Sequence, residues 1–328
     1  HPFGEEKKTN ELNEILSKHT NLKKNIDNEI KKITRSNYPI INTAISDLIS
    51  GGGKRLRPFM VILSSEFGRS SPKLIKLAAG IEILHMATLI HDDIIDEAQN
   101  RRGSTAAQKK FGKNIAVFTG DFLLSKVFDL FVKHSQKKTI YKLSKIVKII
   151  CEGEITQFEN KFNTDITLKD YFHRVRRKTA LLFGYSTYLG AYEAGLRNKN
   201  LYNLYNTGLN FGMAFQIQDD LLDFKGKEKI MGKEVGQDIK SGIYTLPVII
   251  LLQNENNKIK KILNKDNLTS QDLKFIYYKI NHENIIIKSR KIMNKFLSKA
   301  NQHLQQFPKS NARKELKDII YSQYYRRY

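Results

Sequence analysis

Two acidic stretches are the most informative part of this sequence: HDDIID at residues 91–96 and DDLLD at residues 219–223. Both set aspartates among Ile and Leu side chains, and together they contain Asp92, Asp93, Asp96, Asp219, Asp220 and Asp223. Residues i and i+4 of an α-helix lie on one face, about 6 Å apart along the axis. The first and last aspartate of each stretch therefore project together. Because like charges repel, and more so when desolvated, the pattern predicts a compensating positive charge.

The rest of the chain predicts a mostly helical protein. Only 6 Pro interrupt 328 residues, and three glycines at 51–53 precede a helix expected to begin near Pro58. Apolar residues recur at helical intervals in residues 10–50, 73–97, 111–132, 140–162, 168–192 and 201–224. We find no strand alternation, no repeat and no linker. The expected architecture is one all-α domain over residues 1–328, with a mobile Gly- and Lys-rich loop at 225–242.

The formal net charge of +23 has two interpretations. One is attraction to polyanions such as nucleic acid, an anionic membrane or a diphosphate substrate. The other is a compositional bias, because Lys and Asn are scattered along the whole chain. No nucleic-acid motif accompanies the charge and no basic stripe is evident. We therefore assign most of it to composition and predict no nucleic-acid partner.

Cysteine usage and hydropathy indicate the compartment. Cys151 is the only cysteine, so an internal disulfide is excluded and a reducing setting is expected. Its apolar surroundings predict a buried structural thiol. No run of 18 apolar residues is present, which predicts no membrane-spanning segment. The expected location is the cytoplasm or an organellar matrix such as that of the mitochondrion. The chain begins at His1, so a targeting segment would not be visible.

The paired acidic stretches favour a divalent metal site. A single DDxxD is also typical of a solvated acidic turn, but here two occur, each at the polar end of an apolar helix. Mg²⁺ takes oxygen ligands and is usually held by one or two carboxylates together with substrate phosphates. Zn²⁺ would require Cys or His ligands, and His91 alone does not supply a set. The predicted cofactor is Mg²⁺.

Basic residues flank the acids. Lys54, Arg55 and Arg57 follow three glycines, whose backbone N–H groups allow close approach of a phosphate. Arg101 and Arg102 lie just over one helical turn beyond the first acidic stretch. A lone basic cluster is usually a solvated patch. Because these clusters adjoin metal-binding acids, we interpret them as diphosphate-binding groups.

In order and spacing, six motifs resemble the trans-isoprenyl diphosphate synthases, and the long-chain octaprenyl and solanesyl members most of all. They are GGGKRLRP (51–58), LIHDDIIDEAQNRRG (89–103), GDFLLSKVF (120–128), RKTALLF (177–183), FQIQDDLLDF (215–224) and GKEVGQD (232–238). The resemblance implies an all-α isoprenoid synthase bundle with a central cavity, usually assembled as a homodimer. Residues 1–50 lie mainly outside these motifs and are assigned to structure or dimer contacts.

The resemblance also implies roles for individual residues. The isopentenyl diphosphate site matches Lys54, Arg57, His85 and Arg102. The allylic diphosphate site matches Arg101, Lys178, Thr179, Gln216 and Lys233. About three Mg²⁺ ions are implied on Asp92, Asp96 and Asp219, with Asp93, Asp220 and Asp223 as further partners. Catalysis is assigned to Asp92, Asp96, Asp219 and Lys178.

Two positions near the C-terminal end of the resemblance need separate comment. Many family members have Lys in a GKxTLP segment, where this sequence has Ile243 in SGIYTLP, so one diphosphate contact is in doubt; long-chain members tolerate a non-basic residue there. The terminal YYRRY resembles a basic tail that covers the substrate in relatives, with Arg326 as its candidate.

The implied chemistry is ionisation followed by condensation. Mg²⁺ and the cations would pull on the allylic diphosphate until its C–O bond breaks, and the isopentenyl double bond would attack the resulting carbocation. The implied product leaves by a peripheral membrane contact and serves, for example, as the side-chain precursor of ubiquinone.

Product length is expected to depend on the residues below the first acidic stretch. Ala87 lies five residues before Asp92, about 7.5 Å along the helix. With Thr88 it is expected to leave a shaft open, and Phe131 is a candidate floor. The expected product is heptaprenyl to decaprenyl diphosphate. Alternatively, Ala87 only packs and the floor lies elsewhere.

Other functions remain open at this stage. A shorter-chain, geranylgeranyl diphosphate synthase would share every motif. A noncatalytic subunit of a heteromeric synthase would usually have lost one acidic stretch, and both are present. A class I terpene cyclase would lack the GGGKRLRP segment. A nucleic-acid or membrane-surface protein would explain the charge but not the paired DDxxD motifs.

Overall fold

A computed structural model of the chain describes residues 17–98, 100–101, 104–224, 236–254 and 256–325. The helices are α2 (Thr20–Ile33), α3 (Pro39–Ser50), α4 (Leu56–Ser65), α5 (Lys73–Ile95), α6 (Ala107–Phe111), α7 (Lys113–His134), α8 (Lys137–Glu159), α9 (Leu168–Val175), α10 (Leu181–Glu193), α11 (Asn198–Leu222), α12 (Gln237–Lys240), α13 (Leu246–Asn254), α14 (Asn256–Leu263), α15 (Ser270–His282), α16 (Ile285–Leu304) and α17 (Asn311–Tyr325). Within these ranges, β structure is limited to the antiparallel pair β1 (Asn100–Arg101) and β2 (Ser104–Thr105). The predicted all-α class is confirmed.

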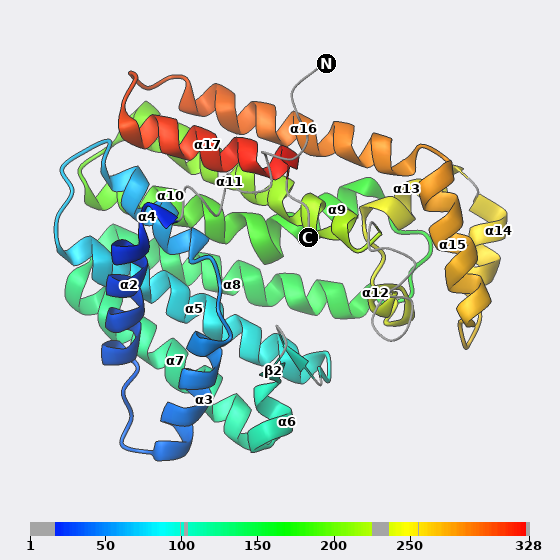
Figure 1. The fold of residues 1–328 in the computed structure, drawn as a ribbon, viewed down its shortest axis with the longest axis horizontal. Coiled ribbons are helices and arrows are strands. Elements are labelled where there is room, and N and C mark those ends of the chain that lie inside the picture. Colours follow the sequence, from blue (N-terminus) through cyan, green and yellow to red (C-terminus); the bar gives the residue numbers. More distant parts are fainter. Residues whose placement is uncertain (1–16, 99, 102–103, 225–235, 255, 326–328) are drawn as a thin grey trace.

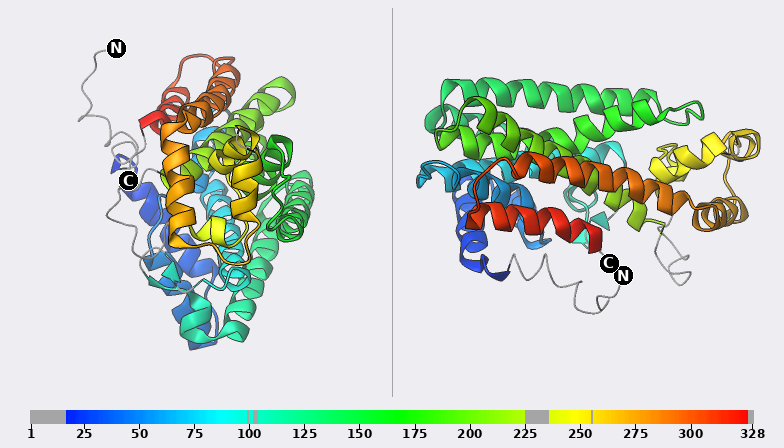
Figure 2. Two further views of the ribbon diagram at one scale, coloured as in Figure 1. Left: turned by 90° about the vertical axis from the view of Figure 1, so that its right-hand side faces the viewer. Right: turned by 90° about the horizontal axis from the view of Figure 1, so that it is seen from above.

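The long helices run roughly along one axis and pack around α5, α10 and α11 (Figure 1). Helix α5 packs against α2, α4 and α7, whereas α10 packs against α4 and α11, and α11 against α16. Helices α13, α14 and α15 gather at one end of the molecule, as all the views show (Figure 2). The first DDxxD stretch ends α5 and the second ends α11, so the packing brings two polar helix ends into one bundle.

Helix α5 is apolar on nearly all sides, which explains its central place. It is long and apolar enough to cross a membrane by length and composition. Its most apolar 18-residue window, however, is 67% buried inside the molecule, and buried residues occur all round the helix from Leu74 to Asp93. A helix that is hydrophobic on every face is typical of the core of a large protein as well as of a membrane span. Its packing against three neighbouring helices identifies α5 as a core helix.

Close backbone contact fixes α10 against α4. A Cβ atom at Gly190 would lie 1.9 Å from the carbonyl oxygen of Val61, so only glycine allows this approach. The contact matters for function because α4 carries Arg57 and α10 carries Leu182 and Phe183, which all line the cavity described below.

The prediction of a single regular helix over residues 168–192 is wrong in one detail. The chain forms α9, then a π-helical turn η1 (Arg176–Ala180), then α10. One extra residue per turn rotates α10 relative to the continuation of a regular helix, and such turns frequently occur at functional sites. Lys178 and Thr179 both lie in η1.

Two further expectations fall on other parts of the chain. The expected buried thiol is wrong: Cys151 is exposed. The buried face of α8 is formed by Leu143, Ile146, Ile150 and Gly153, and Cys151 lies about 100° round the helix from Ile150. Of the predicted mobile loop at 225–242, residues 225–235 lie outside the described residues, and α12 forms within the remainder.

Candidate active site

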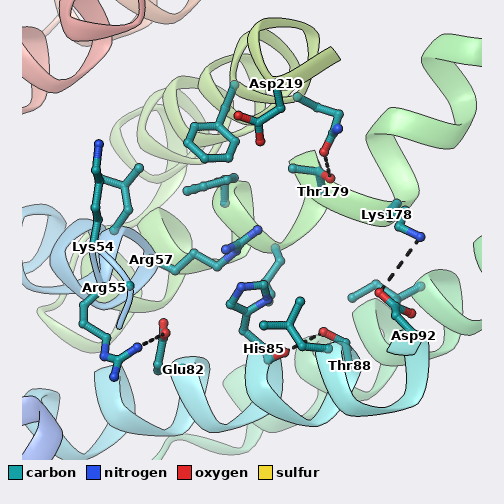
Figure 3. Close-up of a pocket in the computed structure, with 18 of the residues that line it drawn as sticks. Lys54, Arg55, Arg57, Glu82, His85, Thr88, Asp92, Lys178, Thr179 and Asp219 are labelled. Carbon is teal, nitrogen blue, oxygen red and sulfur yellow. Dashed lines mark hydrogen bonds and ion pairs between the residues drawn. The ribbon is translucent and has the colours of Figure 1, made fainter. Parts of the chain in front are cut away.

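A cavity of about 880 Å³ lies between α2, the glycine loop before α4, α5, α8, η1, α10 and α11 (Figure 3). It brings together residues from motifs that are more than 150 positions apart in the sequence. The predicted site residues that line it are Lys54, Arg57, His85, Thr88, Asp92, Lys178, Thr179, Gln216 and Asp219. Its apolar wall comprises Leu56, Leu89, Ile150, Leu182, Phe183 and Phe215.

The acids of the two stretches have different positions. Asp92 on α5 and Asp219 on α11 line the cavity from different walls, as Figure 3 shows. Asp96 and Asp223, at the ends of these helices, have exposed side chains. Burial by surrounding atoms and the neighbouring carboxylates, Asp238 first among them, raise the pKa of Asp223 to about 7. The crowding of carboxylates at the end of α11 therefore favours the protonated form of Asp223.

The other two acids, which the resemblance implies as further metal partners, do not line this cavity. Asp93 is buried and lines a separate cavity of about 40 Å³, because it projects about 100° round α5 from Asp92. Asp220 is also buried, and its two oxygens accept hydrogen bonds from Tyr171 Oη (2.6 Å) and Gln216 Nε2 (2.9 Å). Asp220 therefore positions neighbouring side chains.

The ammonium group of Lys178 lies between the carboxylates of Glu154 and Asp92. Its Nζ lies 3.1 Å from Glu154 and 3.9 Å from Asp92. Burial opposes the charge, but Asp92 and Glu154 outweigh it and hold the pKa of Lys178 above its ordinary value. The π-turn aims this ammonium group at the cavity beside the first acidic stretch, as expected of a group that binds a diphosphate.

Sequence reasoning missed Glu154 and Asp238. Glu154, within the α8 segment EGEITQF, accepts a hydrogen bond from Lys178. Asp238, in the segment GQD, is electrostatically coupled to Asp223 and to Asp96, so it links the two acidic stretches. Burial raises the pKa of Asp238 and Asp96 adds to the rise, whereas Arg174 and Lys178 oppose it. Asp238 lies inside the recognised GKEVGQD motif, whereas Glu154 lies outside all six motifs, so no sequence signal marked it.

A hydrogen-bond chain continues from Asp220 to the predicted allylic site. Thr179 Oγ1 donates to Gln216 Oε1 at 2.7 Å, and Gln216 in turn donates to Asp220. Tyr171 on α9 donates to the same carboxylate. Because each member is held by the next, Thr179 and Gln216 have fixed orientations at the cavity wall.

The predicted isopentenyl side is formed by Lys54, Arg57 and His85. The Arg57 guanidinium lies 4.3 Å from the centroid of the Phe183 ring, which holds it over the apolar wall. Arg55, grouped with these cations from the sequence, instead binds Asp27 and Glu82. Arg55 also lines the cavity, but these ion pairs occupy most of its guanidinium group.

The N-terminal region contributes to the cavity. Ser17, Thr20 and Lys23, at the start of α2, line it. Residues 1–50 were assigned only to structure or dimer contacts, and that assignment is too narrow. No motif marked these three residues, because their place follows from the packing of α2 on α5.

Neither of the two cavities described here reaches Ala87, the residue expected to leave a shaft open. Ala87 is 0% exposed and does not line the cavity, because it is about 140° round α5 from Asp92. Phe131 is also fully buried, and its ring packs beside Gly80 between α5 and α7. Thr88, which donates to the His85 carbonyl, does line the cavity.

Several predicted residues cannot be placed. Arg102, Lys233 and Arg326 lie outside the described residues, as does the side chain of Arg101. Ile243 follows α12, and its backbone N–H donates to the carbonyl of Asp238 at 2.8 Å. At this position the backbone caps α12.

The donor set fits a metal that is completed by a ligand. Among the residues that the structure describes, no group of three or more His, Cys, Asp or Glu side chains is arranged to hold a metal ion by itself. Asp92 and Asp219 nevertheless line the same cavity as Lys54, Arg57 and Lys178. Mg²⁺ is commonly bound by one or two carboxylates plus substrate phosphates, and this arrangement suits such binding.

Known proteins share both sequence and fold with this chain. The family model described as polyprenyl synthetase matches residues 38–280. Heptaprenyl diphosphate synthase component 2 of Bacillus subtilis is 38% identical over 295 residues, covering 90% of this chain and 85% of the relative. A heptaprenyl diphosphate synthase structure from Staphylococcus aureus aligns with a TM-score of 0.87 and 31% identity, covering 95% and 97% of the two chains. A polyprenyl synthase from Caulobacter crescentus, complexed with calcium and isoprenyl diphosphate, aligns over 100% of both chains with a TM-score of 0.90 and 28% identity.

Proposed function

The chain belongs to the polyprenyl synthetase family and is a prenyltransferase, and we propose that it makes a long-chain all-trans polyprenyl diphosphate. The proposed reaction is the Mg²⁺-dependent condensation of isopentenyl diphosphate with an allylic diphosphate such as farnesyl or geranylgeranyl diphosphate. The single observation that carries the proposal is one cavity in which carboxylates of both DDxxD stretches meet three cations, Lys54, Arg57 and Lys178, above an apolar wall.

The cavity supplies a place for each charged group of the reaction. Lys178, Thr179 and Gln216 are proposed to hold the allylic diphosphate, and Lys54, Arg57 and His85 the isopentenyl diphosphate. Mg²⁺ bound by Asp92 and Asp219 would neutralise charge on the leaving diphosphate. Positive groups already fixed around that diphosphate stabilise it without reorganisation, so the main catalytic contribution is electrostatic.

The bonds change in a balanced sequence. The allylic C–O bond breaks, its electron pair leaves with the diphosphate, and an allylic carbocation remains. The π electrons of the isopentenyl double bond then form the new C–C bond, which places the cation on the isopentenyl unit. Loss of a proton to the departed diphosphate restores a double bond. No protein nucleophile is required, and the apolar wall, including Phe183 and Phe215, excludes water from the cation.

A long product requires space that the described cavity does not yet provide. Ala87 and Phe131 lie in the contact between α5 and α7. We propose that the growing chain enters between these two helices, where the small side chain of Ala87 offers least resistance. Replacing Ala87 with Phe would then shorten the main product, as shown by chromatography of the dephosphorylated prenols. Unchanged length would leave Ala87 as a packing residue.

Two alternatives share the site. A geranylgeranyl diphosphate synthase would use the same residues and stop earlier. A component of a two-part enzyme is favoured by the word "component" in the name of the Bacillus subtilis relative. Because both DDxxD stretches are intact, the chain would be the catalytic component of such an enzyme. We propose a homodimer and expect peripheral membrane contact during product release.

The decisive experiment is an elongation assay on the purified chain alone. Isopentenyl diphosphate and farnesyl diphosphate are supplied with Mg²⁺, and the product lengths are measured. We expect long prenols, their loss on chelation, and a fall in rate of at least about 100-fold in Asp92→Asn and Asp219→Asn. A product of only four isoprene units would favour the shorter-chain enzyme. Absence of elongation without a second chain, with activity restored by a partner, would favour the two-part enzyme.

A further inference from the structure

Arg55 binds four residues from three segments of the chain: α2, α5 and the end of α3 with the glycine loop. Its Nε donates to Asp27 Oδ1 on α2 at 2.8 Å, and its Nη1 donates to Glu82 Oε1 on α5 at 3.1 Å (Figure 3). The two Nη atoms also donate to the carbonyls of Gly52 at 3.3 Å and Ile49 at 3.2 Å. A guanidinium has five N–H donors, so these contacts use most of its capacity. Its side chain is 2% exposed, and little of it remains for a ligand.

The backbone of Arg55 is as constrained as its side chain. It has φ 49° and ψ 36°, the left-handed conformation, at the residue that precedes α4. For a residue with a Cβ atom this conformation costs about 1–2 kcal/mol. It persists only where surrounding contacts impose it. The four contacts of the guanidinium provide that constraint, and they fix the direction in which the glycine loop enters α4.

The residues joined by this network belong to one side of the cavity. Lys54 precedes Arg55 and Arg57 follows it by two positions, and both line the cavity. Glu82 lies one helical turn before His85, the third residue of the proposed isopentenyl diphosphate site. The allylic side, on η1 and α11, is held by a different set of contacts, the Thr179–Gln216 chain.

We propose that Arg55 is a positioning residue that, held by Asp27 and Glu82, orients Lys54 and Arg57 for isopentenyl diphosphate. The inference rests on the proposed function and extends it by assigning a role to α2. Through Asp27, this N-terminal helix is tied to the substrate loop, while its residues Thr20 and Lys23 line the same cavity.

Whether neutralising Asp27 or Glu82 weakens or strengthens the binding of isopentenyl diphosphate distinguishes a positioning role from a simple charge effect. If Asp27 and Glu82 acted only through their negative charge, neutralising them would strengthen the binding of an anionic diphosphate. If Arg55 itself contacted the diphosphate, releasing it from these carboxylates would also strengthen binding. Positioning predicts the opposite, because a released Arg55 no longer fixes the loop.

The test compares Asp27→Asn, Glu82→Gln and Arg55→Lys with the unaltered chain. Isothermal titration calorimetry gives the Kd for isopentenyl diphosphate, and initial rates give KM for each substrate. We expect Kd and KM for isopentenyl diphosphate to rise between about 10-fold and 100-fold, while KM for the allylic substrate stays within about twofold. In the Arg55→Lys/Glu82→Gln double variant, Kd for isopentenyl diphosphate should be no higher than in the single variant that binds it less tightly. The two substitutions disrupt the same network, so their effects do not add.

Glu193→Gln is the matched control, since it also neutralises a buried, ion-paired glutamate but lies outside the residues that line the cavity. It is expected to lower thermal stability and leave both KM values unchanged. If Glu82→Gln does not fold, Asp27→Asn gives the same comparison at a side chain that is 24% exposed.

Each outcome decides something. Unchanged or tighter binding of isopentenyl diphosphate in Asp27→Asn and Glu82→Gln would overturn the positioning role, as would an equal rise in KM for both substrates. Failure of the unaltered chain to bind isopentenyl diphosphate would overturn it as well. Binding without elongation would count against the proposed function alone, and weaker binding in the variants would still support the role of Arg55.

Discussion

The hydroxyl of Tyr171 shows how one buried atom can influence substrate binding without touching substrate. It is part of a chain of hydrogen bonds that runs from Tyr171 through Asp220 and Gln216 to Thr179. Burial raises the pKa of Asp220 to about 6, although hydrogen bonds from Tyr171 and Gln216 oppose the rise. Only the last two members of the chain line the cavity.

Replacing Tyr171 with Phe removes one donor and leaves the rest of the ring in place. The Asp220 oxygen would lose its partner in a buried setting, so we expect the free energy of unfolding to fall by about 1–3 kcal/mol. Because Gln216 would also be held less firmly, KM for the allylic diphosphate should rise by about 3-fold to 10-fold. Denaturant titration and initial-rate kinetics check the two effects.

Tyr185→Phe is the control for this substitution. Tyr185 is also fully buried, and its hydroxyl donates to the carbonyl of Thr139 at 2.9 Å, away from the cavity. It should lose comparable stability with no change in either KM. If Tyr171→Phe lowered stability but left KM for the allylic diphosphate unchanged, the hydrogen bonds from Tyr171 to Thr179 would have only a structural role.

At the scale of elements, Glu193 joins the ends of three helices. This last residue of α10 binds Lys73 at the start of α5 and Thr139 in the first turn of α8, at 2.6 Å and 2.5 Å. It also accepts the backbone N–H of Gln136 at 2.8 Å. Burial alone would raise the pKa of Glu193, but these donors outweigh it and leave the pKa lowered.

The lowered pKa gives this helix junction a defined pH dependence. A carboxyl group whose folded pKa lies below its unfolded value stabilises the fold above the unfolded value, here about 4.5, and loses that contribution as pH falls through the folded pKa. We expect Glu193→Gln to be less stable by about 1–3 kcal/mol at neutral pH. The difference should shrink as pH falls below the unfolded value. Urea titrations across pH would contradict this if the difference stayed constant.

The helices were predictable because their apolar spacing is local. The ends of α5 and α7 fell within a few residues of expectation, and one acid of each stretch, Asp92 and Asp219, lines the same cavity. The π-turn at Arg176–Ala180 was not predictable, because it depends on how α9 and α10 pack.

The direction of individual side chains was harder to predict. Within KRLR, Arg55 and Arg57 are chemically identical and both line the cavity. Only distant partners such as Glu82 decide that Arg55 is held in ion pairs while Arg57 lies over the Phe183 ring. Ala87 was assigned to a shaft from its distance along α5. Its angle round the helix places it against α7 instead, and a distance along the axis contains no such information.

At the scale of the whole molecule, one face of α7 remains exposed along its length. Phe118 is 62% and Val132 is 69% exposed, and they are 14 residues apart, four turns along a single face. Asp121, Ser125 and Asp129 lie between them. Phe118 adjoins Val117, which is 37% exposed, and we take these exposed apolar side chains as candidates for contact with another chain.

We expect this face to form the interface of the proposed homodimer. Sedimentation velocity at micromolar concentration should give the mass of two chains for the unaltered protein. Phe118→Glu should shift the distribution to a single chain, because a buried, unpaired carboxylate costs several kcal/mol. Tyr278→Glu is the control, since Tyr278 is 58% exposed on α15, at the other end of the molecule from α7. A dimer that survives Phe118→Glu would place the interface elsewhere, whereas a monomeric unaltered chain would favour a two-component enzyme whose second component covers this face.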